Sequence, residues 1–332
     1  DQRSRLKAIV YSPGEPSGIG PDLIIQLCNS SFWKDVGIPI ICIADSKLLE
    51  DRAKLIGTKI RIKSLKKIDD CEKNILGALQ VINITKCSNT KAGKLYKSNA
   101  LYVLDNLRYS IEQAINNKRI AVVTGPISKE NIISVDKKFS GHTEYIRDLT
   151  KSDDVLMLLG SDKLRVAIAT THIPLKKVSK AITKKLILNK IKILHDELQS
   201  KFNIKNPRIK LLGLNPHAGE GGKIGTEESD ILIPAVKELR KRKINVSMPI
   251  SADTAFTKKV LKETDAFMGM YHDQVLPVIK ALSFGKSINI TLGVPIIRTS
   301  VDHGVALDIA GSGKAETSSF KEAIKAAKKI IK

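Results

Sequence analysis

The stretch YHDQVLPVIKALSFGKSINITLGVPIIRTSVDHG, residues 271–304, is the part of the chain that is richest in metal- and anion-binding side chains. Glycines and prolines interrupt its apolar runs, which predicts short strands, one short helix and turns. His is a ligand for transition metals, whereas Lys and Arg hold phosphate or carboxylate groups. A purely structural stretch seldom has two His, a Lys, an Asn and an Arg so close together, so we expect a functional site here.

Length and composition predict a folded protein of more than one domain. The chain has 332 residues, 42% of them hydrophobic, which is enough for two domains with sizeable cores. No apolar run approaches the roughly 20 residues of a membrane helix, so we expect no membrane contact. The start, DQRSRLKAIVYS, passes directly into a strand-like run and indicates no signal peptide. Four cysteines without a CxxC pair fit a reducing cytoplasm.

The net charge of +22 raises the question of a nucleic-acid partner. Lys greatly outnumbers Arg and is scattered along the whole chain. Aromatic residues make up only 4% of the sequence and leave few platforms for base stacking. We therefore expect a solvated basic surface and no nucleic-acid partner, although this charge could steer an anionic substrate towards a site.

Apolar runs that read as buried strands alternate with helical patterns through the first half, which predicts an α/β sheet. The strands are expected at residues 7–11, 39–44 and 119–123, and the helices at 22–28, after the cap Asp45, and at 98–117. The loop SPGEPSGIGP, residues 12–21, could present N–H groups to an anion or form a plain tight turn. Its glycine spacing does not fit GxGxxG, so it does not indicate a Rossmann fold.

Three His residues each follow an apolar strand-like run, at 164–169, 208–214 and 265–270. They are His172, His217 and His272. If these strands lie parallel in one sheet, the three imidazoles can meet at one edge. Three imidazoles with an open coordination position make a catalytic divalent-metal site. Such ligands favour zinc, while cobalt and magnesium stay open. A single His at the end of a strand is more often structural. The spacing of the three His residues along the chain matches no local motif.

His142 and Thr143 follow a glycine at the expected start of a helix. A helix start can bind an anion or a polar substrate group. The alternative, in which Thr143 only caps the helix and His142 is exposed, is at least as well supported by the sequence.

Seven motifs along nearly the whole chain resemble one family. They are SPGEPSGIGP (12–21), TGPISK (124–129), GHTEY (141–145), TTHIPL (170–175), LNPHAGEGG (214–222), MYHDQVLP (270–277) and NITLGVPIIRTSVDHG (289–304). Together they are similar to the 4-hydroxythreonine-4-phosphate dehydrogenase (PdxA) family, NAD-dependent enzymes of pyridoxal phosphate biosynthesis.

This resemblance implies a divalent-metal-dependent oxidation of 4-phosphooxy-L-threonine by NAD(P)⁺, with decarboxylation of the product to an aminoketone phosphate. It implies an α/β fold of the isocitrate/isopropylmalate-dehydrogenase type, with two αβα domains and no Rossmann fold. We expect residues 1–125 with 286–332 to form the cofactor-side domain. Residues 126–285 would form the metal, substrate and dimerisation domain. The family also implies a homodimer whose active site lies at the subunit interface, with metal ligands from both chains.

The resemblance implies roles for particular residues. The family's metal ligands match His172, His217 and His272. Its substrate-binding residues match His142, Thr143, Lys280, Asn289 and Arg298. The segment 302–315 is similar to the cofactor loop of the wider fold, which implies contacts with NAD or NADP at Gly304, Asp308, Ala310, Gly311 and Lys314. The general base stays open, with Asp253 and Asp273 as candidates because they are near in the sequence.

Two other classes of function compete with this one. A relative within the family could oxidise another phosphorylated four-carbon hydroxy acid or a cyclic dihydrodiol dicarboxylate. A basic nucleic-acid-binding protein is the alternative from a different class, and salt-dependent retention on DNA without bound metal would indicate it.

Overall fold

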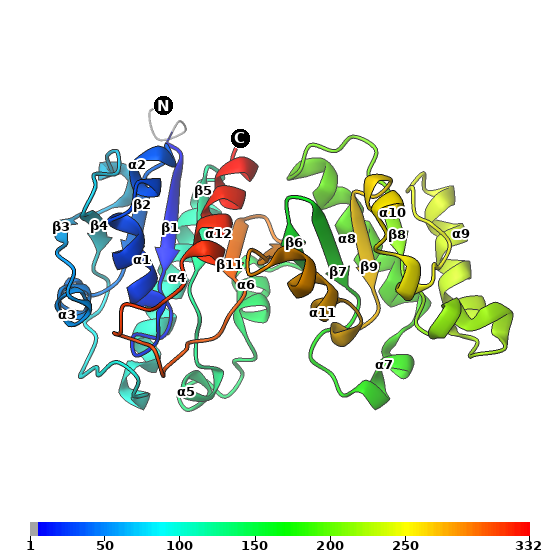
Figure 1. The fold of residues 1–332 in the computed structure, drawn as a ribbon, viewed down its shortest axis with the longest axis horizontal. Helices are drawn as coiled ribbons and strands as arrows, with labels where there is room; N and C mark the ends of the chain where they lie inside the picture. Colours follow the sequence, from blue (N-terminus) through cyan, green and yellow to red (C-terminus); the bar gives the residue numbers. More distant parts are fainter. Residues whose placement is uncertain (1–5) are drawn as a thin grey trace. The chain divides into compact units, whose positions relative to one another are not determined.

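The computed structural model describes residues 6–332, so part of the start on which we based the absence of a signal peptide lies outside the described residues. The chain forms two compact units, Asp1–Asp153 with Val294–Lys332 and Asp154–Gly293, which we call the first and second unit (Figure 1). The sequence predicts domain boundaries at residues 125 and 286. The roles that we expect for these two domains, cofactor side and metal side, stay predictions.

Among the described residues, the first unit contains six parallel strands. Their order is β3 (Arg61–Ser64), β4 (Ala78–Ile82), β2 (Ile40–Ile43), β1 (Ala8–Ser12), β5 (Ile120–Thr124) and β11 (Ile297–Val301). Every residue of β1, β2 and β5 is buried, as expected for central strands of a parallel sheet that is covered on both faces. The strands predicted at 7–11, 39–44 and 119–123 are therefore confirmed.

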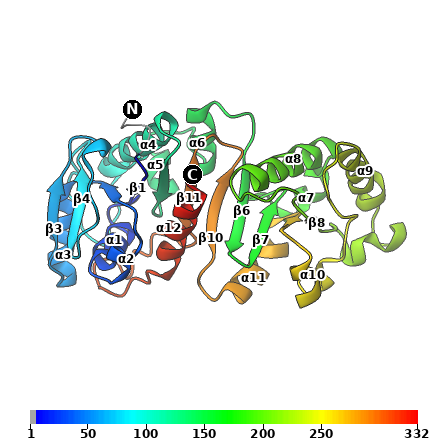
Figure 2. The same cartoon turned by 90° about the horizontal axis from the view of Figure 1, so that it is seen from above.

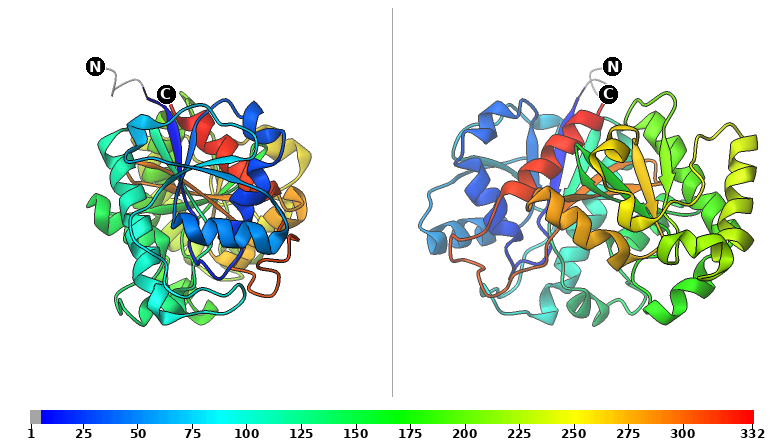
Figure 3. Two further views of the ribbon diagram at one scale, coloured as in Figure 1. Left: turned by 90° about the vertical axis from the view of Figure 1, so that its left-hand side faces the viewer. Right: turned by 45° about the vertical axis from the view of Figure 1, so that its right-hand side comes forward.

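Helices cover both faces of this sheet. One face carries α1 (Gly20–Cys28), α2 (Phe32–Asp35) and α12 (Ser318–Ile330), and the other carries α4 (Ala100–Asn116), α5 (Lys129–Ile133) and α6 (His142–Thr150) (Figure 2). Figure 3 shows α4 and α12 on opposite sides of the strands. Helix α3 (Ser46–Ile56) packs against α1. Tyr11 of β1 contacts Phe320 of α12, with ring centroids 4.6 Å apart, so the first unit is an αβα sandwich.

The second unit contains a mixed sheet. Its strand order is β10 (Ile288–Leu292), β6 (Leu156–Ser161), β7 (Leu164–Ile168), β9 (Ala266–Gly269) and β8 (Ile209–Leu211). β6 pairs with β10 and β7 in antiparallel fashion, whereas β7, β9 and β8 run parallel. Helices α8 (Lys184–Ser200) and α9 (Ile233–Lys241) lie on one face, and α10 (Lys258–Lys262) and α11 (His272–Ser283) lie on the other (Figure 2). Helix α7 (Leu175–Ala181) follows β7 in the chain.

Some local details of the second unit differ from or add to the expectations. A π-helical turn, Glu228–Leu232, comes directly before α9. The strand expected at 208–214 is short, because the chain leaves the sheet after Leu211. His195 of α8 is half-buried, and its Nδ1 atom is buried without a hydrogen-bond partner in the described part of the chain. Within residues 6–332 no helix is both long and apolar enough to cross a membrane.

The predicted cap of α3 is confirmed. The Oδ1 atom of Asp45 accepts from the N–H of Lys47 at 2.9 Å, and its Oδ2 atom accepts from the N–H of Cys87 at 2.8 Å. One carboxylate therefore caps the helix and anchors the loop that contains Cys87.

We expect Asp45→Ala to lower the free energy of unfolding by about 1–2 kcal/mol, because the helix loses its cap acceptor. Urea denaturation measures this change. Asp45→Asn is the matched control, since Asn caps a helix about as well as Asp and should retain most of the stability. Equal stability of Asp45→Ala and the unaltered chain would contradict the capping role.

Candidate functional site

The three strands that precede the candidate metal ligands are neighbours in the sheet of the second unit. β9 lies between β7 and β8 and pairs with both in parallel. The carboxyl ends of these strands therefore lie at the same edge, where ligands of open α/β sheets bind. His172 follows β7, His217 follows β8, and His272 is the first residue of α11 directly after β9. The strand arrangement expected from the sequence is confirmed.

The structure brings two of these imidazoles together. The ring centroids of His172 and His272 are 5.5 Å apart, and both side chains are at least partly exposed. The Nδ1 atom of His272 is 2.6 Å from the Oδ1 atom of Asp273. A carboxylate in this position holds the proton on Nδ1 and leaves the Nε2 lone pair for a metal. Asp273, a candidate base, thus contacts a candidate ligand.

His217 lies in a loop of unusual backbone conformation. From His217 to Gly221 every residue has a positive φ, between 45° and 81°. Non-glycine residues are strained in this region and stay there only where the surroundings hold them. The buried carboxylate of Glu228 anchors the segment that leads into this loop: its Oε1 atom accepts from the N–H groups of Leu214 and Asn215 at 2.8 and 2.7 Å.

Glu228 was not among the residues singled out from the sequence. Its signal is its place shortly after a glycine-rich loop, but only the structure shows which backbone groups it binds. Asp253 lies near His217: hydrogen bonding from Ser251 lowers the pKa of Asp253, and the charge of His217 adds to this effect. A lowered pKa makes this carboxylate a poorer general base at neutral pH.

Within residues 6–332, no three His, Cys, Asp or Glu side chains are grouped closely enough to hold an ion. The structure thus pairs His172 with His272 and does not gather all three candidates. The chemistry of the donor set still fits a transition metal, since imidazole nitrogen is a preferred ligand and Asp273 orients one of the rings. The metal role of the three residues stays a proposal.

A second polar cluster lies in the first unit around Arg298 of β11. The guanidinium is almost fully buried, and its Nε and Nη2 atoms donate to the Oγ1 atom of Thr124 at 3.1 and 2.9 Å. Burial lowers the pKa of Arg298 to about 10, against the opposite effect of Glu144, so the side chain keeps its charge at neutral pH. Thr124 ends β5 and positions the fork from the neighbouring strand.

His142 belongs to this same cluster. Its pKa is lowered well below the usual value by burial and by the nearby charges of Arg298 and Lys129, which keeps the imidazole neutral at pH 7. α6 begins at His142 with Gly141 at the cap position, so the alternative in which Thr143 caps the helix is wrong. Lys129 had no role in the sequence analysis, although it closes the motif TGPISK.

The two remaining candidates for substrate binding are Lys280 and Asn289, both in the second unit. Lys280 is an exposed residue in the last turn of α11, about 12 Å along the helix from His272. Asn289 lies on β10, and its Oδ1 atom is buried without a hydrogen-bond partner among the described residues. An unsatisfied buried acceptor of this kind calls for an explanation, and a bound ligand is one.

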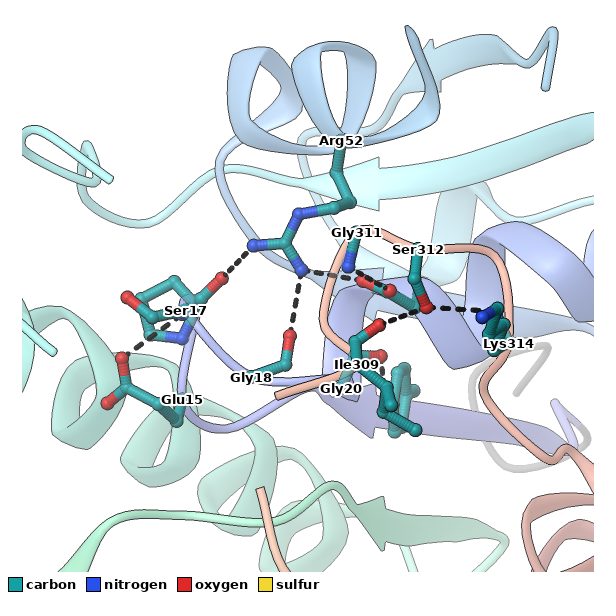
Figure 4. Close-up of polar contacts among 12 residues, drawn as sticks. Glu15, Ser17, Gly18, Gly20, Arg52, Ile309, Gly311, Ser312 and Lys314 are labelled. Carbon is teal, nitrogen blue, oxygen red and sulfur yellow. Dashed lines mark hydrogen bonds and ion pairs between the residues drawn. The ribbon is translucent and has the colours of Figure 1, made fainter. Parts of the chain in front are cut away.

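Loop 12–21 and the loop after β11, which contains the candidate cofactor residues, lie side by side in the first unit (Figure 4). The N–H of Ile19 donates to the carbonyl of Val305 at 2.9 Å. A Cβ atom on Gly18 would lie 2.7 Å from that same carbonyl, so only glycine permits the approach. Four N–H groups of loop 12–21, those of Glu15, Ser17, Gly18 and Ile19, donate to protein acceptors. This favours the tight-turn interpretation over an anion cradle.

Comparisons with known proteins identify the family. The model of the pyridoxal phosphate biosynthetic protein PdxA matches residues 35–327. A 4-hydroxythreonine-4-phosphate dehydrogenase from Enterobacter sp. (strain 638) is 44% identical over 323 residues, 97% of each chain. One from Shewanella frigidimarina (strain NCIMB 400) is 46% identical over 314 residues, 95% of each chain.

A solved structure agrees with this result. The crystal structure of 4-hydroxythreonine-4-phosphate dehydrogenase from Klebsiella pneumoniae superimposes with a TM-score of 0.89 at 31% identity, covering 98% of this chain and 100% of that one. The α/β fold expected from the motifs is thereby confirmed as the fold of this solved dehydrogenase. The chain belongs to the PdxA family of pyridoxal phosphate biosynthetic proteins.

Proposed function

We propose that this protein catalyses the NAD(P)⁺-dependent oxidation of 4-phosphooxy-L-threonine to 2-amino-3-oxo-4-phosphooxybutanoate, which decarboxylates to 3-amino-2-oxopropyl phosphate in the biosynthesis of pyridoxine 5'-phosphate. The observation that supports this best is the near-full-length similarity to two relatives named for this substrate. The pair of His172 and His272 beyond the ends of parallel strands adds support from the geometry.

His172, His217 and His272 would hold one divalent metal ion. Zinc suits three imidazoles, and cobalt and magnesium stay open. When bound, such an ion lowers the pKa of a coordinated substrate hydroxyl, which assists its oxidation at neutral pH. Asp273 fixes the tautomer of His272 for this purpose, and Glu228 holds the loop that carries His217.

The roles proposed for the substrate-binding residues follow from the resemblance to the family. Arg298 and Lys280 are proposed to hold the phosphate, and His142, Thr143 and Asn289 to position the remaining polar groups. A neutral His142 can both donate and accept a hydrogen bond without adding repulsion towards Arg298. Thr124 holds the Arg298 fork in one orientation before the substrate arrives.

The nicotinamide of NAD or NADP would accept the hydride. The proposed contacts with this dinucleotide come from the loop after β11, at Gly304, Asp308, Ala310, Gly311 and Lys314. We assign no general base: Asp273 is engaged with His272, and the pKa of Asp253 is lowered.

We expect the purified protein to reduce NAD⁺ or NADP⁺ when it is given 4-phosphooxy-L-threonine, with loss of turnover after chelation and recovery when Zn²⁺, Co²⁺ or Mg²⁺ is restored. Absorbance of the reduced nicotinamide measures the rate, and a coupled assay detects the aminoketone phosphate. Phosphorylated four-carbon hydroxy acids and a cyclic dihydrodiol dicarboxylate are the control substrates. Faster turnover of either control substrate would contradict the proposed substrate. Full activity after complete metal removal would contradict the metal role.

We also propose a homodimer in which the two chains share each metal site. His217→Ala and His272→Ala should each be folded and inactive. If these two ligands come from different chains, mixed dimers of the two variants contain one intact site, and random mixing restores about a quarter of the normal activity. Co-expression followed by the dehydrogenase assay measures this. If the mixture is as inactive as either variant, then either both ligands of a site come from the same chain, or these residues are not its ligands.

Arg298→Lys should raise the substrate KM about tenfold or more, because a planar fork is replaced by a single ammonium group that cannot keep both bonds to Thr124. The KM for the dinucleotide should change much less. Arg208→Lys is the matched control, since Arg208 pairs with Asp265 at an exposed place of the second unit. An unaltered substrate KM in folded Arg298→Lys would contradict the phosphate role.

A further inference from the structure

One side of α1 holds the loop that follows β11. The N–H of Ile19 donates to the carbonyl of Val305, the Oδ2 atom of Asp22 accepts from the N–H of Gly311 at 2.6 Å, and the Nε2 atom of Gln26 donates to the carbonyl of Ala315 at 3.0 Å. Ile19 is the N-cap residue of α1, and positions 22 and 26 are four residues apart, so their side chains lie on one side of the helix. The loop is thus held at its start, middle and end by a single rigid element.

Asp22 also forms a buried ion pair with Arg52 of α3. The two side chains are almost inaccessible to solvent, and the Nη1 atom of Arg52 lies 2.6 Å from the Oδ1 atom of Asp22. Arg52 further donates to the carbonyls of Gly18 and Pro16 at 2.8 and 2.6 Å (Figure 4). One guanidinium therefore joins α3, loop 12–21 and the carboxylate that holds Gly311.

A buried ion pair is weak evidence for stability, because the desolvation of two charges offsets most of their attraction. The clearer consequence of the Asp22–Arg52 pair is that it fixes the orientation of the Asp22 carboxylate. Gly311 has a φ of +77°, and a Cβ atom there would lie 2.5 Å from the Cδ2 atom of Leu55 and 3.0 Å from the Cβ atom of Ala92. The loop therefore packs tightly against Leu55 of α3 at Gly311. This packing fixes the direction in which the N–H of Gly311 donates to Asp22.

We propose that Asp22, Gln26 and Arg52 are positioning residues that hold the loop of residues 304–315 in the conformation that binds a nicotinamide dinucleotide. This inference rests on the proposed function, in which that loop contacts NAD or NADP. The three residues act through the loop, so their loss weakens dinucleotide binding and leaves the affinity for the phosphorylated substrate largely unchanged.

The first test is Gln26→Met, which removes the donor to Ala315 without altering the ion pair. The dissociation constant of NADH or NADPH, measured by fluorescence titration, should rise about 3- to 10-fold, the effect of one lost hydrogen bond. The substrate KM at saturating dinucleotide should stay within twofold of its normal value. Gln199→Met is the matched control, because it removes a similar bond, to Lys205 at 2.9 Å, in the second unit. It should change neither constant.

The second test is Asp22→Asn, which keeps an acceptor for Gly311 but leaves Arg52 without its counter-ion. We expect a larger loss of dinucleotide affinity than in Gln26→Met, and circular dichroism checks the fold. If Asp22→Asn does not fold, the dinucleotide dissociation constant of Gln26→Met alone tests the positioning role. Wild-type dinucleotide affinity in folded variants, or an equal loss of affinity for substrate and dinucleotide, would overturn the positioning role. If the unaltered protein binds no dinucleotide, the proposed function itself fails, which is a distinguishable result.

Discussion

Parallel strand pairing is the constraint on which the candidate metal site depends. Because β7, β9 and β8 run in the same direction and lie next to one another, their carboxyl ends reach one edge of the second unit's sheet. Residues that are far apart in the chain, such as His172 and His272, become neighbours only through this pairing. A change of strand order or direction would separate them even if every side chain were kept.

Buried polar side chains then fix the positions of other groups in both units. Glu228 accepts from the backbone just before the loop of His217, Thr124 accepts from the guanidinium of Arg298, and Asp22 accepts from the N–H of Gly311. Each of these groups is buried and satisfied by specific partners, as buried polar groups must be. The loops of both units are thus positioned by a few polar contacts from rigid elements, which is a suitable basis for binding small charged ligands.

The candidate sites also show how burial changes the chemistry of side chains. His142 is neutral at pH 7 because of desolvation and two nearby cations, whereas Arg298 keeps its charge in spite of its burial. A neutral imidazole beside a fixed cation is a different binding surface from two cations. This difference does not follow from residue types, since it depends on distances and on the loss of water around each group.

The sequence by itself determined the main strands and helices, since apolar runs such as residues 119–123 are long and uninterrupted, and local signals such as the Asp45 cap depend on neighbours in the chain. It also indicated the family, because seven motifs occur together. Only the tertiary structure decided that His172 meets His272, that Glu228 anchors the loop of His217 and that Lys129 acts on His142. These are tertiary contacts or effects of burial, and no local sequence pattern specifies either.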